Sequence, residues 1–187
     1  APCEFCLGKT HIVKDELLGV SDDETANKDA QNAHRFDDVS ELESKQPDER
    51  FDFWRTELSK CIRCNACRNV CPACSCIQCV FDNPTLGVDQ RVASNSFEEN
   101  QFHIIRAFHV AGRCTDCGEC SRVCPENIPL HLLNRKVIKD LNELYGDYQA
   151  GEEVEGDSPL QSYKDSDANP SIVFARSEAC ESHGGKK

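Results

Sequence analysis

Apolar residues recur at helical spacing in three segments of the chain, and two of these segments begin at a proline. Proline is common in the first turn of a helix, so we expect one helix to begin near Pro47 and another near Pro129. Gly146 is expected to end the second of these helices. The apolar face of the first consists of Phe51, Trp54 and Leu58. The apolar face of the second consists of Leu130, Leu133, Val137, Leu141 and Leu144.

The third helical segment lies between these two and opens with the S-x-x-E pattern of a capping box, formed by Ser96 and Glu99. Gly112 marks its expected end. Its apolar stripe consists of Phe97, Ile104, Phe108 and Ala111, and we expect such stripes to face the core. No alternating segment longer than about four residues favours a strand. The pattern therefore predicts a mainly α protein.

Two runs of cysteines flank that middle segment and share one spacing, Cys-x2-Cys-x2-Cys-x3-Cys-Pro, over residues 61–72 and 114–125. This spacing is typical of proteins that hold 4Fe–4S clusters. Three thiolates two residues apart let a short loop bind three corners of a cube, whereas the fourth points away and binds the other cluster in two-cluster ferredoxins. We therefore predict two 4Fe–4S clusters with exchanged fourth ligands. The predicted ligands are Cys61, Cys64, Cys67 and Cys124 for cluster A, and Cys114, Cys117, Cys120 and Cys71 for cluster B. Structural zinc is the alternative, although zinc sites do not usually need three cysteines in series.

Six further cysteines lie outside the two runs, at Cys3, Cys6, Cys74, Cys76, Cys79 and Cys180. Two separated pairs can supply four thiolates to one metal centre. We predict a third 4Fe–4S cluster, cluster C, and its proposed ligands are Cys3, Cys6, Cys76 and Cys79. Cys76 and Cys79 are preferred because Cys74 is tied to the turn after Pro72, and Cys74 is kept as the alternative ligand. A zinc site and free thiols are the competing interpretations of this set, and Cys180 is expected to be a plain thiol.

The composition separates a neutral middle from two acidic ends. The 187 residues include 14 cysteines, carry a formal net charge of -12, and are only 39% hydrophobic. Residues 15–49 hold 12 acidic and 3 basic side chains, and residues 146–178 hold 8 and 2, whereas residues 50–145 hold 11 and 12. We therefore divide the chain into an N-terminal arm with a cysteine pair at 1–49, a helical iron–sulfur core at 50–145, and an acidic arm at 146–187. The arms are expected to be extended and irregular, or to dock on a basic partner.

The same composition excludes several classes of protein. A strongly acidic chain argues against a nucleic-acid partner, because contacts to phosphates need lysine and arginine. No apolar run approaches the roughly 20 residues that span a bilayer, and no secretory signal is visible. So many cysteines without an export signal favour metal ligation in a reducing cytoplasm over disulfides, and an anaerobic cell suits exposed clusters.

The quoted residues resemble a known family. The segments 51–84 and 102–130, which contain both cysteine runs, are similar to the C-terminal cluster module of beta subunits of formate dehydrogenases and deazaflavin-reducing hydrogenases. The 42 residues between Cys71 and Cys114, and the sequence CPENIPLHLLNRKV that leads into a helix, resemble the α-helical ferredoxin family. The resemblance implies an α-helical ferredoxin-like dicluster core. Beta subunits of this type also have a cysteine pair and a cysteine-rich segment at matching places, which supports cluster C.

This resemblance implies a subunit that transfers electrons and is not an enzyme on its own. Its partners would be a larger catalytic redox subunit, either a tungsten or molybdenum enzyme or a flavin enzyme, and a further electron carrier. A small free-standing subunit of this kind is similar to the partner of tungsten aldehyde-oxidoreductase-like enzymes, such as the ATP-independent benzoyl-CoA reductase. The alternatives are a catalytic iron–sulfur protein with a substrate-accessible cluster and a zinc-stapled interaction protein.

Four arginines lie within or beside the ligand loops, at Arg63, Arg68, Arg113 and Arg122. Positive charge near an anionic cluster raises its reduction potential, so these side chains are candidates for tuning the clusters. The alternative is that they face solvent or a partner.

Overall fold

The computed structural model describes residues 34–82, 96–151, 157–162 and 164–165, and every structural statement below concerns these residues. Their helices, in chain order, are α2 (Asp37–Ser44), α3 (Pro47–Leu58), α4 (Ala66–Asn69), the 3-10 helix η2 (Val80–Asp82), α5 (Ser96–His109), α6 (Glu119–Arg122) and α7 (Leu130–Tyr145). No strand occurs within these ranges. The prediction of a mainly α protein is confirmed for them, whereas most of both predicted arms lies outside the described residues.

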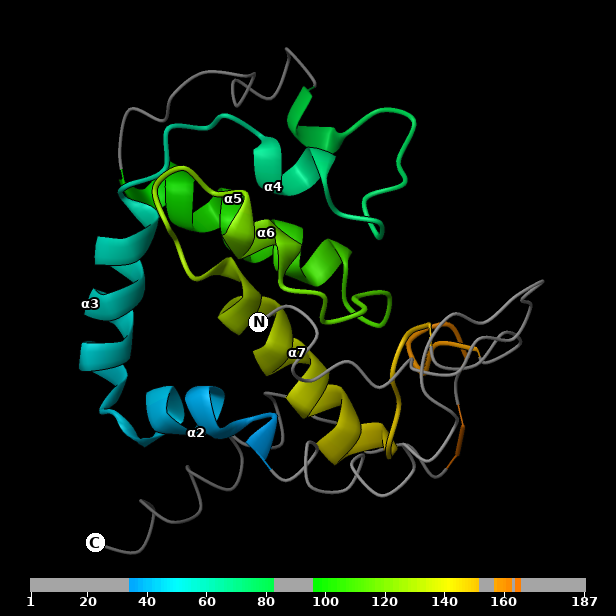
Figure 1. Cartoon of the computed structure of the whole chain (residues 1–187). Helices are drawn as coiled ribbons and strands as arrows, with labels where there is room; N and C mark the ends of the chain where they lie inside the picture. Colours follow the sequence, from blue (N-terminus) through cyan, green and yellow to red (C-terminus); the bar gives the residue numbers. More distant parts are fainter. Residues whose placement is uncertain (1–33, 83–95, 152–156, 163, 166–187) are drawn as a thin grey trace, which may run out of the picture.

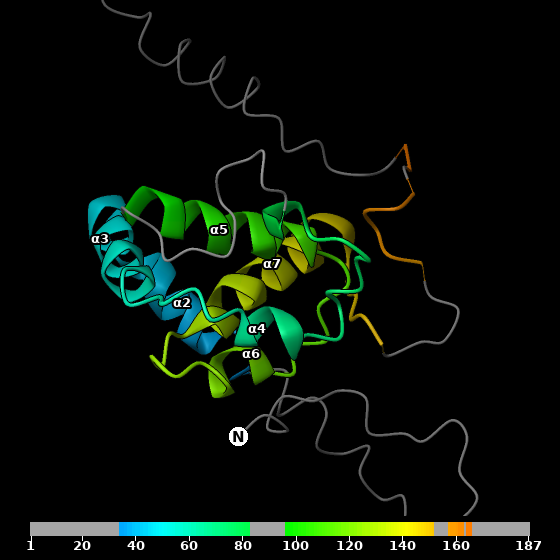
Figure 2. The ribbon, with the colours of Figure 1, turned by 90° about the horizontal axis from the view of Figure 1, so that it is seen from above.

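The long helices pack against one another, and two short helices lie on one side of them (Figures 1 and 2). Helix α5 packs against both α3 and α7, and α2 packs against α7. The short helices α4 and α6 lie side by side, and α6 also contacts α7. Because α4 and α6 each lie inside one cysteine run, this arrangement brings the two runs together.

The two cysteine runs fold as copies of one local structure. Each begins with a loop that contains two residues in the left-handed region, Arg63 and Asn65 in the first copy and Asp116 and Gly118 in the second. Each loop then leads into a four-residue helix, α4 or α6. Asparagine, aspartate and glycine tolerate positive φ better than most residues do, which helps both loops to turn tightly.

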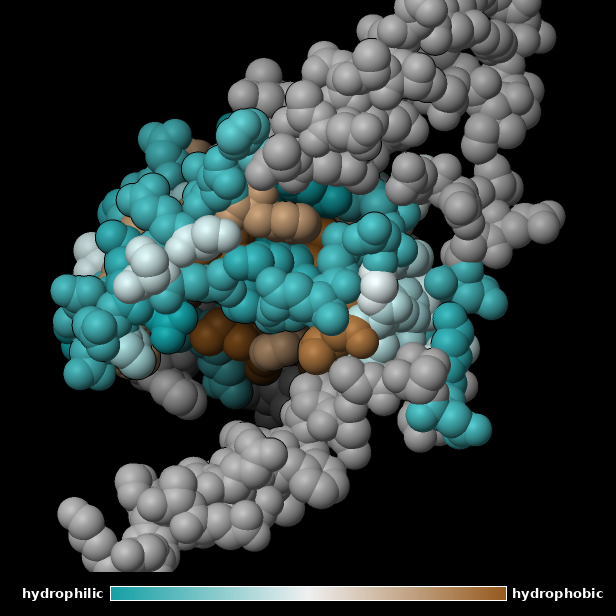
Figure 3. Space-filling model, turned by 90° about the horizontal axis from the view of Figure 1, so that it is seen from below, coloured by the Kyte–Doolittle hydropathy of each residue, from teal (hydrophilic) through white to brown (hydrophobic). Residues whose placement is uncertain are grey.

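The core is small and contains cysteine side chains. Its central cluster consists of Leu58, Cys67, Cys120, Ile128 and Leu130. Several large apolar side chains remain exposed, among them Phe51, Ile77, Phe108 and Leu160. On the face shown in Figure 3, apolar side chains gather in a band between hydrophilic ones. The predicted helix beginning at Pro47 is confirmed, but Phe51 is exposed and only Leu58 of its predicted face is fully buried.

The predicted core face of the middle helix is wrong. Helix α5 begins at Ser96 as expected, yet Ile104 is 43% exposed and Phe108 is 66% exposed. The opposite face is buried instead, and its residues are Phe102, His103, Arg106, Ala107 and Val110. The reason is that this face packs over the cysteine loops, where Arg106 donates a hydrogen bond to the Cys67 carbonyl. The side chains of 96–99, including Phe97 and the capping box, lie outside the described residues.

The last helix follows the prediction closely. Helix α7 begins directly after Pro129, and its C-cap is Gly146, whose φ of 92° favours glycine. Leu130 and Leu141 of the predicted face are buried, and Asn134, Arg135 and Ile138 are buried with them. After the helix, the chain returns to the second cysteine loop, where the Gln149 side-chain amide donates a hydrogen bond to the Cys114 carbonyl at 3.1 Å.

Helix α2 lies within the segment that composition assigned to the N-terminal arm. It is anchored on α7 by ion pairs from Glu43 to Lys136 and Lys139. Val39 is buried beneath it. The packed helices therefore begin before the predicted core boundary at 50, and α7 ends at the predicted boundary at 145. Among the described residues, no helix is long and apolar enough to cross a membrane.

The Glu43 ion pairs should make a small, pH-dependent contribution to stability. Hydrogen bonds from Lys136 and Lys139 lower the pKa of Glu43, so its contribution is complete above the ordinary value of about 4.3 and is lost as the pH falls through the lower folded value. We expect Glu43→Gln to lower the free energy of unfolding by less than about 1 kcal/mol, equally at pH 8 and pH 6. Anaerobic thermal unfolding at both pH values measures this, with Glu41→Gln on the same helix as the control. A cost that changes between pH 8 and pH 6 would contradict the assignment.

Candidate metal centres

The four predicted ligands of cluster A line one cavity, which we call cavity A. Cys61, Cys64 and Cys67 come from the first cysteine run, and Cys124 comes from the second. The Arg63 backbone N–H donates a hydrogen bond to the Cys61 sulfur at 3.3 Å. The cavity is closed by side chains that include Phe102, His103 and Leu130. The structure therefore brings together four cysteines that are up to 63 positions apart in the sequence.

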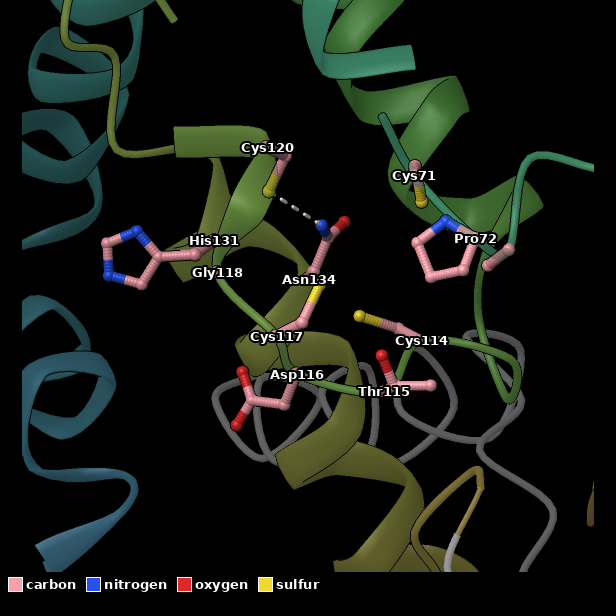
Figure 4. A pocket seen from close by; sticks show the side chains of 11 residues that line it. Cys71, Pro72, Cys114, Thr115, Asp116, Cys117, Gly118, Cys120, His131 and Asn134 are labelled. Carbon is pink, nitrogen blue, oxygen red and sulfur yellow. Dashed lines mark hydrogen bonds between the residues drawn. The ribbon is translucent and has the colours of Figure 1, made fainter. Parts of the chain in front are cut away.

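The four predicted ligands of cluster B line a second cavity, cavity B (Figure 4). Cys114, Cys117 and Cys120 come from the second run, and Cys71 comes from the first. Figure 4 shows the sulfur atoms of Cys71, Cys114 and Cys120 pointing into the space between the two segments. Asn134, on α7, donates a hydrogen bond from its side-chain amide to the Cys120 sulfur at 3.6 Å. The exchange of fourth cysteines between the runs is thus present in both cavities.

The exchange follows from local backbone structure. After α4, the Cys71 N–H donates to the Arg68 carbonyl at 3.3 Å, and after α6 the Cys124 N–H donates to the Ser121 carbonyl at 3.1 Å. The turn after each short helix therefore directs the following cysteine, Cys71 or Cys124, away from the loop that precedes the helix. Because α4 and α6 lie side by side, each of these cysteines reaches the neighbouring cavity.

The donor set of both cavities fits a 4Fe–4S cube. All eight cysteines are free thiols, which is the form that iron requires. Burial raises the pKa of Cys114 to about 12 and that of Cys120 to about 11, so these thiols need a bound cation to become thiolates at neutral pH. Among the described residues, no three His, Cys, Asp or Glu side chains converge closely enough to hold a single metal ion.

His103 gives cavity A a buried polar group without a partner. The residue is 2% exposed, and neither ring nitrogen has a hydrogen-bond partner within the described structure. Burial, followed by the charges of Arg106 and Arg63, lowers the pKa of His103 to about 3, so the ring is neutral and carries one N–H at physiological pH. A buried N–H without a partner is costly. The sulfur atoms of a bound cluster would satisfy it, as Asn134 is satisfied by Cys120 in cavity B.

A buried ion-pair network holds the loop of cavity B. Asp116, between the ligands Cys114 and Cys117, accepts hydrogen bonds from the Nε atoms of Arg35 at 3.0 Å and Arg135 at 3.1 Å. All three side chains are almost fully buried. Arg35 also donates to Gln149, whose amide binds the Cys114 carbonyl. The network ties residues near α2, the cavity B loop and α7 to one another.

The four arginines singled out by sequence have different surroundings. Arg63 is buried, lines cavity A and lies over the Phe102 ring at 4.1 Å. Arg68 pairs with Asp82 at 2.7 Å. Arg113 and Arg122 are exposed, and Arg122 pairs with Glu119 on its own helix. The structure therefore places one of the four, Arg63, on the wall of a cluster cavity.

Sequence reasoning missed His103, Arg106, Asp116, Asn134 and Arg35 as site residues. None of them belongs to a recognised motif. The available signal was the position of polar residues on segments that must cover the clusters. His103 and Arg106 interrupt the apolar pattern of α5 at a spacing of three residues, and Asp116 occupies the same loop position as Arg63 in the first run.

The described part of the proposed third site forms a separate groove. Cys74, Cys76 and Cys79 line it together with Arg68 and Arg106. Cys74 also lies beside Cys71, and a hydrogen bond between the two thiols is the main reason that the pKa of Cys71 falls to about 5. Cys76 is exposed, and the Cys79 thiol accepts a hydrogen bond from Arg68. Cys3, Cys6 and Cys180 lie outside the described residues.

Comparison with known proteins agrees with this geometry. Residues 57–128 match the family model of the 4Fe-4S dicluster domain. These residues are therefore similar to a ferredoxin-type dicluster module, and we call them the dicluster module. The match includes both cysteine runs and the whole of α5, and it supports two 4Fe–4S clusters.

A curated relative of this chain is the F420-dependent formate dehydrogenase subunit beta of Methanocaldococcus jannaschii. The two sequences are 30% identical over 99 residues, which is 52% of this chain and 25% of that protein. The chain therefore matches about a quarter of the length of its relative. The resemblance to formate dehydrogenase beta subunits is confirmed over about half of this chain.

Proposed function

We propose that this protein is an electron-transfer subunit that relays single electrons through its 4Fe–4S clusters, between a larger catalytic oxidoreductase subunit and another redox carrier. The observation that carries the proposal is the pair of adjacent cavities, each lined by three cysteines of one run and one of the other. Cys67 of cavity A and Cys120 of cavity B belong to the same buried core cluster. Clusters held so close together suit transfer of electrons from one to the next.

The cysteine assignment is part of the proposal. Cys61, Cys64, Cys67 and Cys124 would hold one cube, and Cys114, Cys117, Cys120 and Cys71 would hold the other. When bound, each cube supplies reversible one-electron chemistry. The protein residues fix the cubes through thiolates, keep water away by burial, and direct N–H groups such as that of Asn134 at the sulfur atoms.

A third cube on Cys3, Cys6, Cys76 and Cys79 would extend the relay. Cys76 and Cys79 line a groove that is bordered by Arg106, and Arg106 also contacts the carbonyl of Cys67 in cavity A. The hydrogen bond between Cys74 and Cys71 engages Cys74 next to cavity B, which favours Cys76 and Cys79 as the ligands from this segment. An electron that enters through the groove would then be close to the dicluster module.

The partner follows from the relative. That protein is a beta subunit of a formate dehydrogenase, and we propose an analogous larger catalytic subunit here, with a tungsten or molybdenum centre or a flavin. A tungsten enzyme of the aldehyde-oxidoreductase type, such as the ATP-independent benzoyl-CoA reductase, is one such partner. Free cysteines in this number require a reducing compartment, which for this protein would be the cytoplasm of an anaerobic cell.

Metal content tests the proposal directly. We expect protein purified without oxygen to contain about 8 irons per chain for two cubes, or about 12 for three, with matching sulfide. The reduced protein should show the paramagnetic resonance spectrum of interacting clusters and should pass its electrons reversibly to a viologen dye. Iron with matching sulfide but without reversible oxidation would contradict the relay function. One or more zinc ions per chain without iron would overturn the cluster assignment itself.

A further inference from the structure

Arg106 is a buried cation that borders the groove of Cys74 and Cys79 and contacts the backbone of the cavity A loop. It lies on α5 and is 4% exposed. One Nη atom donates a hydrogen bond to the backbone carbonyl of Cys67, a cavity A residue, at 2.8 Å. Its Nε atom has no hydrogen-bond partner in the described structure. The guanidinium also hydrogen-bonds the Cys74 thiol, which itself lies beside Cys71 of cavity B. It is therefore held between the cavity A loop and the segment that follows Cys71, and its Nε–H is unused.

The charge of Arg106 is balanced by sulfur and not by a carboxylate. Burial lowers the pKa of Arg106, but the charges of nearby thiolates raise it more. These thiols belong to Cys67, Cys120, Cys74 and Cys71. They include predicted ligands of both clusters. Within the described ranges, no Asp or Glu forms an ion pair with Arg106, whereas Arg35, Arg68 and Arg122 each have a carboxylate partner.

A buried charge without a counter-ion is strongly unfavourable in a protein interior. A cube held by four thiolates is an anion, and it gains one further negative charge when it is reduced. The positive charge of Arg106 should therefore stabilise a nearby cluster most strongly when that cluster is reduced. Its closeness to thiols of both cavities means that one cation would serve two clusters.

We propose that Arg106 is the shared counter-ion of clusters A and B, and that it sets their reduction potentials by stabilising the reduced form of each. This inference rests on the proposed function, because it requires both clusters to be present. Arg106 neither gives nor accepts electrons; it acts only through its charge. Arg106 is therefore a positioning residue, which acts on the clusters only through its fixed positive charge. It also borders the groove that contains Cys76 and Cys79.

The test compares Arg106→Gln with the unchanged protein and with Arg122→Gln, all as the full chain purified without oxygen. Arg122 is a matched control, because it lies between ligands Cys120 and Cys124 but is exposed and paired with Glu119. Iron and sulfide are counted first, and each cluster is then titrated with its paramagnetic resonance signal as the readout. For Arg106→Gln we expect the ratio of reduced to oxidised cluster at a fixed potential to fall at least about tenfold for both clusters, a shift of about 59 mV for a one-electron couple.

The outcomes separate the inference from the function on which it rests. If the unchanged protein holds no clusters, the proposed function fails. If it holds two clusters and Arg106→Gln moves their potentials no more than Arg122→Gln does, the inference alone is overturned. If Arg106→Gln cannot assemble clusters, Arg106→Lys decides. Two clusters with potentials near those of the unchanged protein would support a role for charge. Loss of clusters in Arg106→Lys too would show that the hydrogen bond to Cys67, and not the charge, is what matters.

Discussion

Replacing Cys124 with alanine should remove cluster A and leave cluster B in place. Cys124 belongs to the second cysteine run, so a purely local interpretation would assign it to the cluster bound by Cys114, Cys117 and Cys120. In the structure it lines cavity A with the cysteines of the first run. The expected result is a loss of about four of the irons, because a cube that has lost one of four thiolates is held only weakly.

The measurement is iron content together with the paramagnetic resonance spectrum of the reduced protein. Two reference variants identify the remaining cluster. Cys61→Ala removes a cysteine of the first run that lines cavity A, and Cys117→Ala removes one of the second run that lines cavity B. The residual spectrum of Cys124→Ala should match that of Cys61→Ala. By the same reasoning, Cys71→Ala should match Cys117→Ala.

The opposite pairing of spectra would show that each run binds its own cluster with all four cysteines. The cavities would then have to rearrange when iron binds. Cys180→Ala serves as the control for a general effect of removing a thiol, since this cysteine lies outside both runs. It should leave the irons of the dicluster module unchanged.

The parts of the molecule that sequence predicted well are those governed by covalent spacing. The two cysteine runs predicted which cysteines lie together, and the structure gathers the eight into two sets of four, while their role as ligands stays a prediction. Spacing is informative here because a cube imposes nearly fixed positions on its thiolates. The helix starts at Pro47 and Ser96, and the Gly146 cap, were also predictable, because caps depend on local backbone chemistry.

The burial of side chains was harder to predict, because a helix face that covers a cluster can be buried although it carries polar residues. Ile104 and Phe108 look like core residues in a sequence, yet they are exposed, while His103 and Arg106 on the same helix are buried. An apolar stripe normally identifies the inner face of a helix. A helix that covers an anionic cluster instead turns its polar residues inward. Helix α2 was missed for a simpler reason, since its acidic sequence has little apolar pattern and its contact with α7 depends on ion pairs.

Replacing Asp116 with asparagine should destabilise the folded protein far more than the loss of an exposed charge does. Among the described side chains, Asp116 is the carboxylate that pairs with two buried guanidiniums, Arg35 and Arg135. Breaking a buried ion pair by removing one partner costs about 3–5 kcal/mol, because a buried charge loses its counter-ion. Total stabilities are about 5–15 kcal/mol, so this loss is a large fraction. Asparagine also tolerates the positive φ of 56° at this position, so the variant tests the charge and not the backbone.

The measurement is the midpoint of anaerobic thermal unfolding, which should fall by roughly 10 °C or more for a loss of this size. Asp140→Asn is the matched control, because Asp140 makes an ion pair with Lys136 in which both side chains are 42% exposed. That variant should lose no more than about 1 kcal/mol. A similar decrease in both variants would contradict the proposed role of the buried network.

A second substitution separates charge from packing. If two uncompensated guanidiniums cause the loss, removing one of them in the Asp116→Asn background should restore part of the stability. Arg35→Met is the suitable change, because methionine fills much of the same volume without a charge. In the unchanged protein, however, Arg35→Met should be destabilising, since it removes the link from Asp116 to Gln149 and onward to the Cys114 carbonyl. The same substitution should therefore have opposite signs in the two backgrounds, a reversal that loss of packing alone does not produce.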